Sequence, residues 1–187
     1  MKKSVKLFIA LVLSLLLTTN AWSQTSTAGD NVSLEVMNIC LMETNSATVS
    51  LTLSCITPGE ALTPATNSDL FVRISSIVPA NTSRDLTARI STGAVPYGTI
   101  LKLVSASCTT TNSGGNLGTA LSTPITLSAI DQNLITGIGT CYTGTGNNDG
   151  YQMTYTWEPD YNSTNYGLIE SLSTTNILVV FTISNIY

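Results

Sequence analysis

Four cysteines are the side chains of this 187-residue sequence with the clearest capacity for chemistry. Cys40, Cys55, Cys108 and Cys141 are spaced too widely for the C-x-x-C pairs that bind zinc or run redox reactions. The sequence has no histidine, which excludes His-based acid–base catalysis and leaves no imidazole to activate a thiol. An even number of cysteines in an exported chain predicts two disulfides. Three connectivities are open, and we favour Cys40–Cys55 across an expected hairpin together with Cys108–Cys141.

The other residue types that catalyse reactions occur without partners. Lys102 is the one base that could activate a serine, but its alternating position predicts an outward charge on a strand. Glu158 and Asp160 resemble a glycosidase pair, yet they flank Pro159 in an expected loop. Residues 147–150 (NNDG) resemble part of a calcium loop but are interpreted as a hairpin turn, because Asp-Gly favours positive φ. We therefore predict a non-enzymatic protein with no catalytic residues, no metal and no cofactor.

Aromatic residues gather between positions 142 and 166. Tyr151, Tyr155 and Trp157 alternate and are predicted to form the core face of one strand. Tyr161 and Tyr166 lie in expected loops, where an aromatic face can contact a ligand such as a sugar ring. They are the candidate ligand contacts of a second hypothesis, a secreted glycan- or protein-binding module.

The first 23 residues have the composition of a secretory signal peptide. Lys2, Lys3 and Lys6 precede an eleven-residue apolar run at 7–17, and small residues at 21 and 23 precede the expected cleavage site. The run is too short to span a bilayer, which needs about 20 residues. We expect export through the periplasm to the cell surface or medium, with no membrane span after cleavage.

The part beyond the signal peptide is acidic. It keeps only Arg73, Arg84, Arg89 and Lys102 against all eleven acidic residues of the chain. Four cations cannot build a basic face large enough for nucleic acid or anionic lipid. We expect a flexible leader at 24–30 and a single domain at 31–187.

Alternating apolar residues recur along that domain, and no segment shows a helical apolar stripe. We predict nine or ten strands at 32–36, 47–55, 70–74, 86–90, 99–107, 125–127, 134–141, 151–157, 166–171 and 176–187. The alternation at 47–55 is the cleanest in the chain. The expected fold is all-β, an antiparallel β-sandwich of immunoglobulin-like or jelly-roll type, with a closed β-barrel as the second choice.

Several features together resemble small exported β-proteins of Bacteroidota and, more loosely, pilin and spore-coat-U-type subunits. They are the signal peptide ending before Gln24, the cysteines Cys40 and Cys55 at the ends of the first hairpin, the segment 135–144, and the terminal strand 176–187. The resemblance implies a structural or adhesive surface subunit that associates with its own copies or with other surface subunits.

An assembled subunit of this kind needs a segment that can complete a neighbour's sheet. Val32, Leu34 and Val36 alternate with polar residues directly after the leader, so residues 32–36 are a candidate donor strand. The alternative is that this segment is simply the first strand of its own domain. We name residues 32–36 the donor segment.

Overall fold

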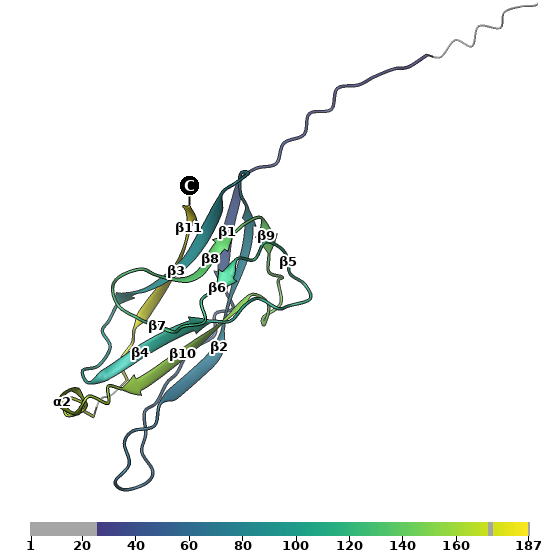
Figure 1. Cartoon of the computed structure of the whole chain (residues 1–187). Helices are drawn as coiled ribbons and strands as arrows, with labels where there is room; N and C mark the ends of the chain where they lie inside the picture. The colour runs from purple at the N-terminus through teal and green to yellow at the C-terminus, as the bar shows by residue number, and fades with distance from the viewer. Residues whose placement is uncertain (1–25, 172–173, 187) are drawn as a thin grey trace, which may run out of the picture. The chain divides into compact units, whose positions relative to one another are not determined.

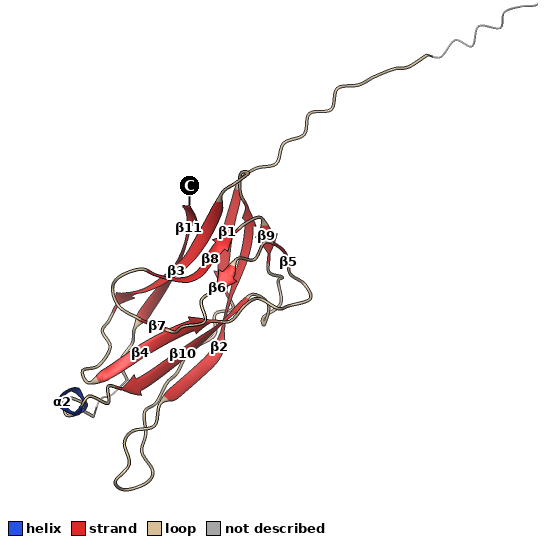
Figure 2. Cartoon of the chain, in the orientation of Figure 1, coloured by secondary structure: helices blue, strands red, loops and turns tan. Residues whose placement is uncertain are grey.

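The computed structural model describes residues 26–171 and 174–186, so the predicted signal peptide lies outside the described residues (Figure 1). The chain divides into two units, Met1–Glu35 and Val36–Tyr187. In the first unit, residues 26–35 form neither helix nor strand and are exposed. The second unit is all-β, with two antiparallel sheets packed together and not closed into a barrel (Figure 2). The predicted sandwich is confirmed and the second choice, a barrel, is wrong.

The larger sheet contains seven strands. Their order is β5-β9-β2-β10-β4-β7, with β1 paired to β2 outside this path. Their bounds are β1 Ile39–Thr44, β2 Ala65–Ile77, β4 Thr99–Ser105, β5 Gly114–Gly115, β7 Ile125–Thr126, β9 Cys141–Tyr142 and β10 Tyr151–Pro159. β10 lies between β2 and β4 and pairs with both along most of its length, which makes it the central strand.

The smaller sheet contains four strands in the order β11-β3-β8-β6. Their bounds are β3 Ser83–Thr92, β6 Thr119–Ala120, β8 Gln132–Ile138 and β11 Leu178–Ile186. β11 pairs with β3 through nine residues and is an edge strand, so one of its two sides has no partner among the described strands.

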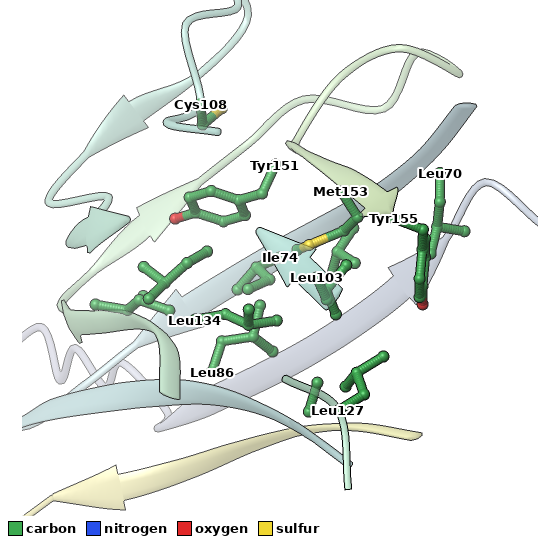
Figure 3. Packing of buried hydrophobic residues seen from close by; sticks show 14 of the residues in the cluster. Leu70, Ile74, Leu86, Leu103, Cys108, Leu127, Leu134, Tyr151, Met153 and Tyr155 are labelled. Atoms are coloured by element: carbon green, nitrogen blue, oxygen red, sulfur yellow. The ribbon is translucent and has the colours of Figure 1, made fainter. Parts of the chain in front are cut away.

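The core lies between the sheets and follows the predicted alternation. Val72 of β2, Leu86 of β3, Leu103 of β4 and Met153 of β10 are completely buried, and Figure 3 shows Leu86, Leu103 and Met153 close together. Full burial of such side chains stabilises the fold by about 1.5–3 kcal/mol each. Tyr151 and Tyr155 point into this core as predicted, while Trp157 on the same face is half-buried.

A tight turn directly precedes the central strand β10. The carboxylate of Asp149 accepts a hydrogen bond from the amide of Gly146 at 2.8 Å, and Gly150 follows with φ +103°. A side chain at Gly150 would collide with the carbonyl of Val72 in β2. The predicted turn at 147–150 is thus present, and the carboxylate that resembled a calcium ligand is used in forming it.

Three predicted strands are wrong, and the first of them, residues 32–36, forms neither helix nor strand. Residues 166–171 were expected to be extended, but Ser163–Tyr166 form the short helix α2. The Asn162 side chain caps it by accepting from the Thr164 amide at 3.1 Å, a local bond that favours a helical turn. Residues 47–55 form no strand beyond a single bridge between Ser54 and Thr63. The first strand of the domain is instead β1.

No helix in the described part of the chain is long and apolar enough to cross a membrane.

Candidate functional site

The residues that might have formed a hydrolytic site are engaged in structural contacts. Lys102 on β4 and Glu158 on β10 occupy neighbouring strands and form an ion pair at 2.5 Å. Within the described residues, no group of three or more acidic or cysteine side chains is placed to hold a metal ion. Lys102 therefore has a carboxylate partner, and the Glu158 carboxylate is engaged in this ion pair.

Asp160 supports the turn that contains α2. Its carboxylate accepts hydrogen bonds from the Asn165 side chain at 2.6 Å and from the Asn162 amide at 3.0 Å. These bonds favour the charged form, so the Asn165 contact first and the Asn162 amide second lower the pKa of Asp160. The carboxylate fixes the position of α2 and of the tyrosines around it.

Both candidate ligand-contact tyrosines contact the same residue, Leu62, in the loop before β2. The hydroxyl of Tyr166 accepts from the Leu62 amide at 3.1 Å, and the hydroxyl of Tyr161 donates to its carbonyl at 3.4 Å. The ring of Tyr161 is more than half exposed, and that of Tyr166 is half-buried. The two side chains hold the loop in place, and their role as ligand contacts stays a prediction.

The structure does not support the favoured pairing of Cys40 with Cys55. Cys40 lies opposite Ser76 near one end of β2, whereas Cys55 lies beside the Ser54–Thr63 bridge beyond the other end. At about 3.3 Å per residue this separation is roughly 40 Å, far beyond disulfide reach. Both thiols are exposed and unbonded. The hairpin that was expected to bring them together is much longer than the sequence indicated.

Cys108 and Cys141, by contrast, lie near each other in the core. Both are buried, and no disulfide joins them in this structure. Burial first and the nearby Cys108 second raise the pKa of the Cys141 thiol, against an opposing effect of Arg84, and the resulting pKa is about 11. The Cys108 thiol thus lies within electrostatic range of the Cys141 thiol, and the predicted Cys108–Cys141 bond is absent from this structure.

The donor segment has its apolar side chains exposed. Val32, Leu34 and Val36 are 76%, 89% and 77% accessible, and no residue between 26 and 38 belongs to a strand. Three aliphatic side chains on one face of an extended segment are costly to leave in water. The alternative, that these residues form the first strand of their own domain, is wrong, because that strand begins at Ile39.

The two long sides of the sandwich differ. On one side the chain crosses between the sheets, from β5 through β6 to β7 and then to β8, and the carbonyl of Ser128 in the last crossing accepts from Ile90 of β3. The opposite side is bounded by residues 65–70 of β2 and by β11. We call it the open side, because neither of these edges has a ladder partner on that side among the described strands.

Residues 46–53 lie on the open side, and we name them the cover segment. Ala47, Val49 and Leu51 pack against the core and are half-buried, while Thr48, Ser50 and Thr52 between them are exposed. Among the described residues, none of the backbone amides or carbonyls of the cover segment makes a hydrogen bond to another backbone group. The segment thus has the side-chain pattern of a strand without its ladder.

Asn45 marks the point where the ladder between β1 and β2 ends. Its side chain accepts from the amide of Phe71 at 3.1 Å and donates to the carbonyl of Asp69 at 2.8 Å, so it replaces the next strand residue. Ser46 follows with φ +56°, a conformation that a residue with a side chain adopts rarely. This kink turns the cover segment away from hydrogen-bonding distance of β2. An Asn-Ser pair between two apolar runs is the one sequence signal that could have revealed it.

In the smaller sheet, β11 also has core-facing side chains that are only partly covered. Val179, Phe181 and Ile183 face the core but are only half-buried, whereas Leu86, Ala88 and Leu134 on β3 and β8 are almost inaccessible. The apolar face of this edge strand therefore still has room for further contact. The outer edges of β2 and β11 and the loosely held cover segment form the candidate site.

No protein-family model, curated protein or solved structure matches this chain.

Proposed function

We propose that this protein is an exported, non-enzymatic surface subunit that assembles by adding a strand of one copy to the open side of the next. The observation that carries the proposal is that one chain has both an exposed apolar segment without a sheet and sheet edges without a neighbouring strand. The donor segment exposes an alternating apolar face, and the open side exposes two strand edges over a partly covered core. The open side could give the donor segment a sheet to pair with, and the donor segment could give the open side a strand that covers its core.

The physical basis is the ordinary chemistry of strand addition. An extended segment gains main-chain hydrogen bonds from a free sheet edge and buries alternate side chains between the sheets. Natural proteins shorten or cover such edges, because an unpaired edge recruits other chains. The nine-residue β11 is neither short nor charged, since its described side chains are apolar or hydroxyl-bearing. An edge of this kind is suited to a partner.

Export fits the sequence and the cysteines. The predicted signal peptide at 1–23 directs the chain out of the reducing cytosol, and disulfides form in such compartments. We propose that Cys108 and Cys141 are bonded in the exported protein. Peptide mapping of the native chain under non-reducing conditions should recover one peptide pair that contains both cysteines. Recovery of both as free thiols would contradict this.

The test of assembly uses one donor-face variant and a matched control. Size-exclusion chromatography with light scattering on the full chain should give a mass that rises with concentration. Leu34→Asp should keep the protein monomeric, because a carboxylate on the buried face of the added strand would lose its hydration. Ser33→Asp carries the same charge on the opposite face and should assemble as the wild type does. A wild-type chain that stays monomeric at every concentration, or a Leu34→Asp variant that assembles equally well, would overturn the proposal.

A further inference from the structure

The donor segment and the cover segment share a sequence pattern. Residues 32–36 read Val-Ser-Leu-Glu-Val and residues 49–53 read Val-Ser-Leu-Thr-Leu. The two apolar triplets agree at two positions and differ by one methylene at the third. In the cover segment the apolar positions 49 and 51 face the core, and the intervening Ser50 and Thr52 face the solvent.

On this basis we infer that the donor segment of one copy takes the place of the cover segment of another, so that residues 46–53 are a built-in placeholder for the incoming strand. This inference rests on the proposed assembly, and it identifies the position of the cover segment as the place where the donor segment binds. Val32 and Leu34 would replace Val49 and Leu51 with identical side chains. Glu35 would take the exposed position of Thr52, where its carboxylate stays hydrated.

The cover segment is prevented from forming a ladder by its attachments at both ends. At its start, the Asn45 side chain occupies the hydrogen-bonding groups of β2, and Ser46 adopts a positive φ. At its far end, the Ser54–Thr63 bridge fixes the returning chain, and Tyr166 holds Leu62. An incoming strand is not attached at either end, so it can place the same side chains in the same positions. Once the Asn45 side chain is displaced together with the cover segment, the incoming strand can also bond to the Phe71 amide and the Asp69 carbonyl of β2.

The occupant has to come from a second copy. β1 keeps Ile39 opposite Ile77. In the register of the cover segment, Val36 would take the place of Leu53, beside the Ser54–Thr63 bridge and roughly 40 Å away along β2. Val36 is three residues from Ile39 and reaches about 10 Å from it. The chain's own donor segment therefore cannot enter its own open side while β1 remains paired.

The experiment measures binding of a fluorescent peptide with the sequence of residues 30–38 to the full chain carrying Leu34→Asp, which cannot donate. We expect saturable binding in an anisotropy titration. Adding Leu51→Ala to the acceptor weakens the placeholder and should tighten peptide binding about fivefold to tenfold. Thr52→Ala, on the exposed face of the same segment, should leave the affinity unchanged. A peptide with Glu35→Thr and Val36→Leu reproduces the cover sequence and should bind at least as tightly.

Each result separates this inference from the assembly proposal. If Leu51→Ala leaves binding unchanged or weakens it, the cover segment is not displaced and the inference is wrong. If the peptide does not bind although the wild-type chain assembles, the donor segment enters elsewhere and the inference is also wrong. If neither peptide binding nor assembly is seen, both proposals are wrong. Circular dichroism checks that the Leu51 variant is folded, and Leu51→Val gives a milder substitution with the same expected direction.

Discussion

The fully paired strands of the larger sheet and the open side of the sandwich are built from the same kind of sequence and reach different degrees of completion. Among the paired strands, Leu103 of β4 and Met153 of the central strand β10 are fully buried and have hydrogen-bonded neighbours on both edges. On the open side, Leu51 and Phe181 show the same alternation but are half-buried beside unpaired edges. Apolar alternation therefore tells which face of a segment turns inward. It does not tell whether a backbone partner is present.

Met153→Ala should cause the largest loss of stability. Met153 is fully buried in the central strand, so its truncation leaves a cavity and should lower the free energy of unfolding by about 3 kcal/mol. Urea denaturation measures the loss. Thr154→Ala, on the opposite face of β10, is the control and should cost much less. A loss below about 1 kcal/mol for Met153→Ala would show that the core around the paired strands is not tightly packed.

Leu51→Ala should have a clearly smaller effect on the same measurement. Leu51 is half-buried on a segment without a ladder, so we expect a loss of about 1 kcal/mol in the free energy of unfolding. Thr52→Ala should be neutral. A loss for Leu51→Ala as large as that of Met153→Ala would mean that the cover segment is part of the main core, and the comparison between the paired strands and the open side would fail.

Asp160→Asn should have the smallest effect, and it probes the end of the loop that follows the cover segment. Because hydrogen bonds lower the pKa of Asp160, its contribution to stability is present above about pH 4 and is lost as the pH falls through its folded-state pKa. Asp160 is partly exposed and its carboxylate is screened by solvent, so the effect is small. Wild type should be slightly more stable than the variant at pH 7, and the difference should shrink as the pH is lowered below about 4. A difference that stays constant as the pH is lowered would contradict this assignment.

Much of the fold could be predicted from the sequence because buried strands require regular alternation. The patterns at 70–74 and 86–90 correspond to β2 and β3, with their apolar residues in the core. β1 was missed as a separate strand. It lies on an edge and pairs with β2 alone, so its sequence ICLMET does not need a strict pattern.

The parts of the site that the sequence did not reveal depend on contacts distant in the chain. The donor segment could be proposed from alternation alone; its apolar side chains are exposed, and its role as a donor stays a prediction. The cover segment was predicted as an ordinary strand, because nothing local shows that the Asn45 side chain replaces its ladder. The separation of Cys40 from Cys55 was equally hidden, because it depends on β2 being thirteen residues long.

Hydrogen exchange on the full chain, compared at low and high protein concentration, tests the central claim most directly. At low concentration the amides of both the donor and cover segments should exchange quickly, while those of β10 and β4 stay protected. At high concentration the donor segment should become protected and the cover segment should remain fast. Protection of the cover segment in the monomer, or a donor segment that exchanges quickly at every concentration, would contradict the account.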